Sequence, residues 1–262
     1  MLKRKRAIWF GFRAQTLQKM PYEPGMQCRI CDVSLQLDGG TMAYAPNQRH
    51  IEIAFSSGSL LQNGKPYEFQ RLEIGQLLVT SGALAASDPF VFPDPPPFTQ
   101  AIPAGRYPVS VAVACYGTGD ERDERVAFAR VEMSDLPVVS WTMALTERQD
   151  PSALEHDGYF GYGVDAGTGC FMDPVAGRLL AERMGLEDEY SNVIIDGMET
   201  TYRATRSWLD WRPSPEHDEN VICFSSGWGD GSYPSFFGFS AEGHLCALVT
   251  DFFILSDTEN AA

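Results

Sequence analysis

The stretch that most constrains the fold is residues 225–251, which read SSGWGDGSYPSFFGFSAEGHLCALVTD. Glycine permits the positive φ angles of tight turns, and the aromatic and apolar runs between the glycines favour strands. The pattern predicts a strand, a tight turn, a second strand, another turn and a third strand. The carboxylates of Asp230 and Glu242 fall at the two turns. We therefore expect this stretch to close a β-rich domain.

Alternating apolar and polar residues predict further strands upstream. From Leu72 onward the pattern gives a strand, a Ser-Gly turn and a second strand. Residues 107–132 read as a β-hairpin around a polar loop. The proline run at 93–97 cannot join a central strand, so we expect a stiff surface connector there. The sequence HIEIAF at 50–55 also reads as a short alternating segment.

One segment has a clear helical period. Within residues 174–186, Val175, Leu179 and Met184 recur on one helical face. Asp173 can accept hydrogen bonds from the first-turn amides, and a proline follows it at the first helical position. Together with the strands, this predicts an α+β fold of predominantly antiparallel β-sheet, sandwich-like or strongly curved, with one or two short helices.

Charge is distributed unevenly along the chain. Residues 1–25 contain six Lys/Arg and one Glu, so the remainder of this chain of net charge −15 carries −20. We expect a basic N-terminal arm, 1–25, and a single α+β domain, 26–262; two intimate β sub-domains, 26–150 and 151–262, are the alternative. An acidic body repels nucleic acid and anionic membranes and attracts basic partners, although it also serves solubility.

The apolar runs and the cysteines favour a cytoplasmic protein. No run approaches the roughly 18 apolar residues of a transmembrane helix, and the N-terminal apolar segment is too short for a signal peptide. Cys28 and Cys31 form a CxxC pair, but no second pair completes a zinc site. We expect Cys115, Cys223 and Cys246, inside apolar strand-like runs, to be small buried hydrophobic residues.

The glycine-rich loop GVDAGTG, residues 163–169, invites comparison with phosphate-binding loops. It lacks the GK[ST] ending of such a loop and does not lead directly into a helix. We expect Gly167 and Gly169 to supply the positive φ angles of a hairpin turn. A Cys170–His244 pair stays open as a nucleophile and base.

Four aspartates fall near the ends of predicted strands, and one of them, Asp173, is already expected to cap the helix. If Asp165, Asp230 and Asp251 converge, they form an all-oxygen site suited to Mg²⁺ or Ca²⁺. The alternative for Asp230 is a turn in which its side chain accepts hydrogen bonds from backbone amides two residues on.

Two tryptophans lie three residues apart in the segment RSWLDWRP. Trp208 and Trp211 are flanked there by Arg206, Asp210 and Arg212. Tryptophan and arginine are favoured as anchors of protein interfaces. The alternative is a pair of core tryptophans with ion-paired flanks.

Five segments in order carry a family resemblance: LVTSGALAASDPF, IPAGRYPVSVAVA, RVAFARVEMSDLPVVSW, GYGVDAGTGCFMD, and FSSGWGDGSYPSFFGFSAEGHL followed by TDF. Together they resemble the bacterial DUF4241 family, which has no generally assigned activity, over about residues 70–253. Residues 1–70 match less clearly. Members of this family often look like neighbours of toxin and immunity genes, so the resemblance implies an immunity role, which the fold alone does not.

Two main hypotheses follow. The first is a non-catalytic, cytoplasmic immunity protein whose acidic surface masks the active site of a cognate, basic toxin domain, without cofactor, nucleic acid or membrane. Its expected partner-binding residues are Trp228, Asp230, Tyr233, Glu242, Trp208 and Trp211. The alternative is a small metal-assisted hydrolase that uses Asp165, Asp230 and Asp251. A ligand-sensing module with a pocket between its sheets is a third hypothesis.

Overall fold

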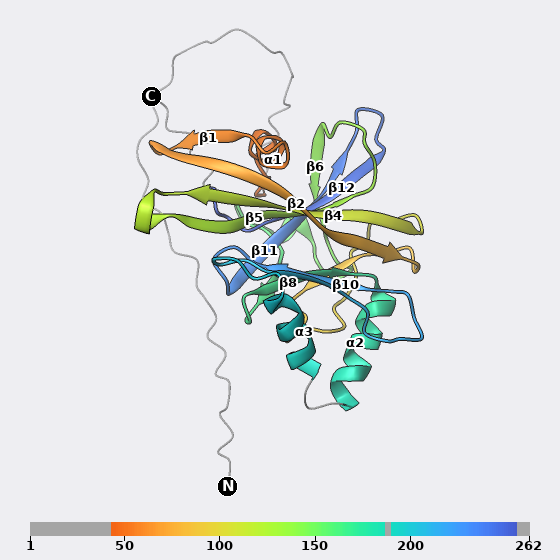
Figure 1. The fold of residues 1–262 in the computed structure, drawn as a ribbon. Helices are drawn as coiled ribbons and strands as arrows, with labels where there is room; N and C mark the ends of the chain where they lie inside the picture. Colours follow the sequence, from red (N-terminus) through yellow and green to blue (C-terminus); the bar gives the residue numbers. More distant parts are fainter. Residues whose placement is uncertain (1–42, 187–189, 256–262) are drawn as a thin grey trace. The chain divides into compact units, whose positions relative to one another are not determined.

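The structure, a computed structural model, describes residues 43–186 and 190–255. Contacts divide the chain after Gly40, and every described residue belongs to the unit Thr41–Ala262. This unit is an α+β fold dominated by antiparallel strands, which confirms the predicted fold class (Figure 1). The predicted basic arm, 1–25, and the Cys28–Cys31 pair lie outside the described residues.

Helices are few in the described part of the chain. They are α1 (Gln48–Phe55), α2 (Pro174–Leu186) and α3 (Tyr190–Glu199), with the short 3-10 helices η1 (Gly119–Glu121) and η2 (Pro151–Ala153). The strands are β1 (Ser59–Gln62), β2 (Lys65–Val79), β3 (Ala85–Ser87), β4 (Gly105–Tyr116), β5 (Asp123–Glu132), β6 (Ser140–Met143), β7 (Gly161–Val164), β8 (Thr168–Met172), β9 (Trp208–Trp211), β10 (Val221–Ser225), β11 (Gly231–Phe239) and β12 (Leu245–Asp251).

The strands form two antiparallel sheets. The large sheet has the order β1-β2-β4-β5-β12-β11-β6, and β7 also pairs with β11. The small sheet has the order β3-β8-β10-β9. Strands from before and after residue 150 pair directly in both sheets, since β5 pairs with β12 and β3 with β8.

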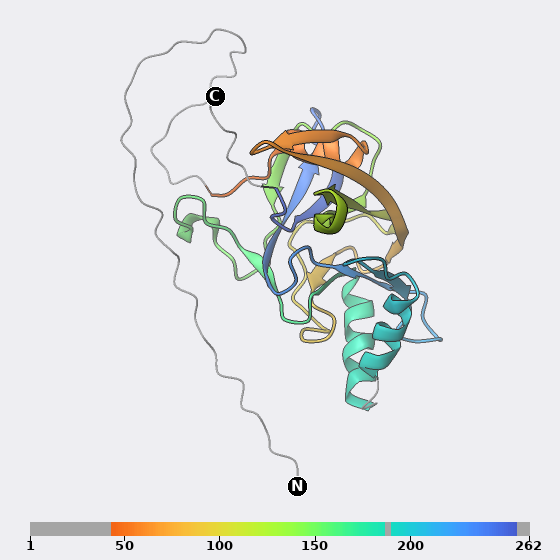
Figure 2. The same ribbon diagram turned by 60° about the vertical axis from the view of Figure 1, so that its left-hand side comes forward.

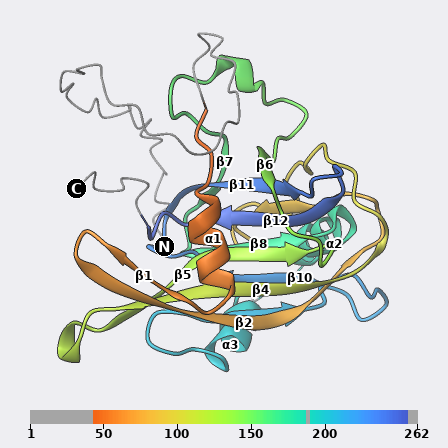
Figure 3. The same ribbon diagram turned by 90° about the horizontal axis from the view of Figure 1, so that it is seen from above.

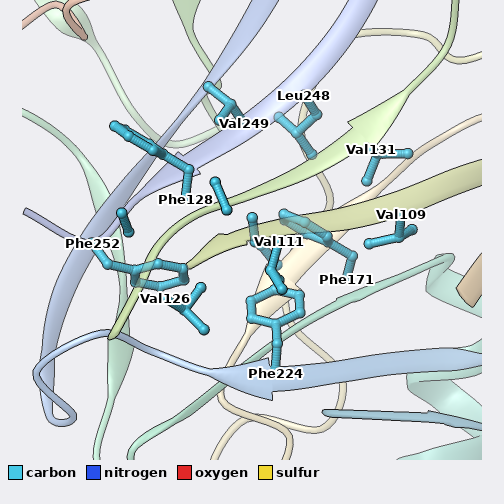
Figure 4. Close-up of a cluster of buried hydrophobic side chains, with 14 of the residues drawn as sticks. Val109, Val111, Val126, Phe128, Val131, Phe171, Phe224, Leu248, Val249 and Phe252 are labelled. Carbon is cyan, nitrogen blue, oxygen red and sulfur yellow. The ribbon is translucent and has the colours of Figure 1, made fainter. Parts of the chain in front are cut away.

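The small sheet is covered on both faces. Phe171 and Phe224 belong to the main core cluster, and Figure 4 shows their rings turned toward Val111 of the large sheet. On the opposite face, Cys170 and Cys223 join the second cluster, which includes residues of α2 and α3. Figure 2 shows these two helices side by side on that face. Because successive residues of a strand point to opposite faces, the small sheet lies between the large sheet and the two helices.

Helix α1 covers the other face of the large sheet, as Figure 3 shows from above. The HIEIAF segment predicted to alternate as a strand is therefore helical, and that prediction is wrong. Asn47 caps the helix by accepting a hydrogen bond from His50 N at 3.2 Å, and Ile51, Ala54 and Phe55 are buried at helical spacing. The short segment fits both periods, and the cap and the buried face favour the helix.

The predicted hairpin over residues 107–132 is confirmed. β4 and β5 pair in register from Val109 opposite Val131 to Tyr116 opposite Asp123, with a bulge beside Ala112. The predicted helix over 174–186 is also confirmed as α2. The proline run at 93–97 lies outside both sheets, between β3 and β4, as expected of a connector.

Two predicted turns join different sheets. The strands on either side of the 163–169 loop, β7 and β8, pair with β11 and β10, so this loop is not a hairpin turn. Gly167 has a positive φ of 64°, but Gly169 lies within β8 without a positive φ. In the same way, β10 belongs to the small sheet and β11 to the large sheet, so the turn between them is not a hairpin turn. Within residues 225–251, the hairpin is formed by β11 and β12. Strand patterns specify turns but not pairing partners.

The strand cysteines are largely as expected. Cys223 and Cys246 are buried, whereas Cys115 is half-buried near the end of β4. Burial raises the pKa of the Cys223 thiol well above its ordinary value. Cys170 is also buried and donates to the carbonyl oxygen of Ser87 at 3.2 Å.

Candidate functional site

The turn between β10 and β11 presents a tryptophan to solvent. At Gly227, φ is +62°, and an added Cβ would stand 2.7 Å from the Cβ of Phe252. Ser226 and Gly229 close the turn, because Gly229 N donates to Ser226 O at 3.0 Å and Ser226 Oγ donates to Gly229 O at 2.9 Å. The indole of Trp228 consequently projects outward, and the residue is 56% exposed.

Two side chains from the β4–β5 hairpin hold this indole. The guanidinium carbon of Arg125 lies 5.2 Å from the ring centroid of Trp228. The ring of Tyr116 lies 6.5 Å away at an interplanar angle of 60°. Arg125 also donates to Gly227 O at 3.4 Å, which ties the hairpin to the turn. A cation–π contact at an exposed site contributes about 0.5–1 kcal/mol, so the indole has a preferred position before any partner arrives.

Asp123 organises the two side chains that contact Trp228. Its Oδ2 accepts from Arg125 Nε at 2.9 Å and from Tyr116 Oη at 3.1 Å. Burial would raise the pKa of Asp123, but hydrogen bonds from Arg125, the Glu124 amide and Tyr116 hold it below its ordinary value. Burial, with the neighbouring Asp123 carboxylate, raises the pKa of Tyr116 to about 12. At neutral pH this group therefore combines a carboxylate, a guanidinium and a neutral phenol.

Asp230 connects the turn to the loop between β7 and β8. Its Oδ1 accepts from Gly167 N at 3.1 Å, so Asp230 bonds to another loop, whereas the sequence predicted a bond to an amide two residues on. That loop is held in turn by the buried Asp88, whose Oδ2 accepts from Asp165 N and Ala166 N at 2.9 and 2.8 Å. Asp165 and Asp230 are themselves exposed. We call the group formed by Tyr116, Asp123, Arg125, Trp228 and Asp230 the Trp228 surface.

The other sequence-predicted partner residues lie in different settings. Tyr233 is only 4% exposed, and its hydroxyl donates to Gly229 O at 2.9 Å, so it supports the turn from inside. Glu242 lies beyond the opposite end of β11, and the nine residues of that strand separate it from Trp228 by about 30 Å at roughly 3.3 Å per residue.

Trp208 and Trp211 lie on β9, at the edge of the small sheet. Both are half-buried, but they pack against different clusters: Trp208 against the main core and Trp211 against the cluster beneath α2 and α3. Each also has an arginine over its ring, Arg206 at 5.8 Å and Arg183 at 5.2 Å. The two tryptophans therefore do not form one exposed patch.

The three aspartates of the hydrolase hypothesis are not gathered. Asp251 is 5% exposed, and its carboxylate accepts from Tyr44 Oη and Phe253 N at 2.8 Å each. Asp165 and Asp230 lie at the exposed loops described above. Within residues 43–186 and 190–255, no group of three His, Cys, Asp or Glu side chains is placed to hold a metal ion.

The structure adds Tyr116, Asp123 and Arg125 to the residues expected from the sequence. The signal for them was the charged GTGDERDER loop at 117–125, which Tyr116 directly precedes, within the predicted hairpin. The missing information was spatial, because these residues precede Trp228 by about a hundred positions. What this arrangement offers chemically is recognition: an aromatic face, a paired guanidinium and carboxylates, held in fixed positions.

In the part of the chain that the structure describes, no helix is long and apolar enough to cross a membrane. Comparison with curated proteins and with solved structures finds no match. The family model described as "Protein of unknown function (DUF4241)" matches residues 77–250, a span that contains the whole Trp228 surface. The chain therefore belongs to the DUF4241 family, whose function is unknown.

Proposed function

We propose that this protein is a non-catalytic binding protein, a cytoplasmic immunity factor that masks the active site of a basic toxin domain. The observation that carries the proposal is the exposed indole of Trp228, held by Arg125 and Tyr116 on a closed turn. Tryptophan, tyrosine and arginine contribute most of the binding energy at many protein interfaces. A side chain that is already positioned loses less conformational entropy when a partner binds.

The charges around Trp228 favour a basic partner. Exposed carboxylates occur on η1 and on the two neighbouring loops, at Asp120, Glu121, Asp165 and Asp230. Three arginines of this region are ion-paired, Arg122 and Arg206 with Glu124 and Arg125 with Asp123. Carboxylates that face solvent steer a cationic partner and raise its association rate. A toxin that acts on a phosphate-containing substrate has a cationic site of this kind.

The first test measures binding to a toxin domain encoded by a neighbouring gene, by biolayer interferometry with the full chain. Trp228→Ala should weaken binding by at least about 30-fold, the loss typical of an interface hot spot. Because Trp228 is 56% exposed, the thermal unfolding midpoint of the Trp228→Ala variant should stay close to that of the wild type. Val139→Ala is the control: this apolar side chain is 52% exposed, and Val139 N donates to Phe239 O at the end of β11 farthest from Trp228, so its loss should leave affinity unchanged.

The second test addresses charge. Reversal of Asp120 and Glu121 to lysine should lower the association rate and flatten its dependence on salt. Glu242→Lys makes the same type of change at the far end of β11 and should have little effect. Unchanged affinity in both the Trp228 variant and the double charge variant would remove this surface from the interface. Failure of the protein to protect cells that express the toxin domain would remove the immunity role itself.

A further inference from the structure

A pocket of about 520 Å³ lies where β6 and β7 diverge along one edge of β11. β6 pairs with residues 236–239 of β11 and β7 with residues 231–234, so Ser235 lies between the two pairings and lines the pocket. Other walls come from β3, β7 and loop residues 91–96. The volume falls within the roughly 300–1,000 Å³ of small-molecule sites.

The loop that walls the pocket is fixed at both ends. At its start, the buried carboxylate of Asp88 accepts from Phe90 N at 2.9 Å and also from Ala166 N at 2.8 Å. At its end, Phe98 forms an isolated β-bridge with Thr146. The proline run between these anchors restricts φ at several successive residues. The pocket is therefore formed before a ligand binds, which lowers the conformational cost of binding.

Four aromatic residues contribute to the lining, namely Phe92, Phe98, Phe160 and Tyr162. Phe92 is 47% exposed although it is large and apolar. Burial raises the pKa of Tyr162 well above its ordinary value, so this side chain is a neutral phenol at physiological pH. Aromatic faces carry a negative electrostatic potential, and they attract organic cations as well as apolar groups.

The charge of the lining has one sign. Among the described residues that line the pocket, Asp94 is the one charged residue, and none is Lys, Arg or His. We infer that the pocket binds an organic ammonium ion, with its aryl or alkyl body among the aromatic rings and its charged head near Asp94. An anionic ligand would meet the carboxylate and the aromatic faces without a compensating cation. A neutral ligand of the same shape would gain the apolar contacts alone.

The test uses three aromatic probes of similar size with the purified full chain. They are benzyltrimethylammonium, its neutral carbon isostere neopentylbenzene, and the anion phenylacetate, and binding is followed by ligand-detected NMR and calorimetry. The cation should bind with a dissociation constant on the order of 1 mM or tighter. It should bind at least about fivefold more tightly than the neutral isostere, and phenylacetate should bind most weakly. No protein partner is involved, so the result is independent of the proposed immunity role.

Variants locate the site. Gly163→Leu should abolish binding of the cation, because a Cβ at Gly163 would meet Phe92 at an ordinary 3.8 Å and the rest of the side chain would occupy the pocket. Asp94→Asn should weaken the cation about three- to fivefold at low salt and leave the neutral isostere unchanged. Asp196→Asn, an exposed aspartate on α3, is the matched control and should change neither.

Two results would overturn the inference. Equal or tighter binding of the neutral isostere would show that charge plays no part in recognition. Absence of cation binding at concentrations several times about 1 mM would show that the pocket is not a site for ammonium ions. If Gly163→Leu does not fold, the Asp94→Asn comparison still decides, because a loss shared by cation and neutral probe would contradict a role for this carboxylate.

Discussion

One buried carboxylate, Asp173, connects a helix to a turn and should contribute strongly to stability. The residue is fully buried. Its Oδ1 accepts from Val175 N at 2.7 Å and so caps α2. Its Oδ2 accepts from Thr80 N and Ser81 N at 2.8 Å each and from Ser81 Oγ at 2.9 Å. The same side chain thus closes the first turn of α2 and holds the turn that follows β2.

Asp173→Ala removes the acceptor for all four donors. Loss of a helix cap costs about 1 kcal/mol. Each of the three donors in the 80–81 turn also loses its acceptor, at a cost in stability of about 1 kcal/mol. This is the low end of the roughly 1–3 kcal/mol for an unsatisfied buried donor, because water can take the place of the carboxylate. The sum is about 4 kcal/mol, a large share of the roughly 5–15 kcal/mol by which domains are stable. The variant should therefore be strongly destabilised.

A second variant separates the two roles. Serine is a good N-cap residue, so Asp173→Ser should restore the bond to the helix and recover about 1 kcal/mol. Its shorter side chain has one oxygen, which cannot also serve the 80–81 turn. The assay is urea unfolding followed by tryptophan fluorescence, with the free energy of unfolding taken from the midpoint at constant m. A loss below about 1.5 kcal/mol for Asp173→Ala would refute the reasoning. Equal stability of both variants would show that the cap contributes nothing.

Two further predictions follow from local geometry. Burial would raise the pKa of Glu132, but the hydrogen bond and charge of Arg130 hold it below its ordinary value. Because the folded-state pKa is depressed, this stabilisation is present above the ordinary pKa of about 4.3 and is lost as pH falls through the folded-state pKa. Wild type should therefore lose stability more steeply than Glu132→Gln between about pH 5 and pH 3, and parallel urea-unfolding curves would contradict this. Gly227→Ala should destabilise the fold by about 2–4 kcal/mol, because its φ is positive and its Cβ would clash with Phe252. Gly243→Ala, also at positive φ but with open space around it, should lose about 1 kcal/mol; equal losses in thermal melts would disprove the role of the clash.

The elements that could be predicted from the sequence are those specified by local signals. The β4–β5 hairpin follows from two alternating runs around one polar loop, and α2 follows from Asp173, Pro174 and the apolar period. Helix α3 was missed, because it contains β-branched residues and Gly197. The structure explains that glycine: an added Cβ would stand 2.7 Å from Leu209, so the glycine lets α3 approach β9.

Sheet membership could not be predicted, because it depends on contacts distant in sequence. In β10, Ile222 and Phe224 face the main core while Val221 and Cys223 face the helices. A run that is apolar on both faces shows that a strand is buried but not which strands lie beside it. The candidate site was only partly predictable, for the same reason. Turn chemistry places Trp228 and Asp230 at a turn, whereas Arg125 reaches Trp228 from a hairpin about a hundred residues earlier in the chain.

Both proposed binding features, the Trp228 surface and the aromatic pocket, lie at segments that cross from one sheet to the other. A chain that leaves one sheet for the other exposes backbone amides that no strand pairs, and such groups need acceptors when they are buried. Asp88 supplies them for the loop between β7 and β8, and Asp230 ties that loop to the turn bearing Trp228. These carboxylates fix loops that would otherwise be mobile, so the Trp228 surface and the aromatic pocket should both keep their geometry on binding. Rigid recognition of this kind predicts small backbone changes between the free and bound protein, which amide chemical shifts would reveal.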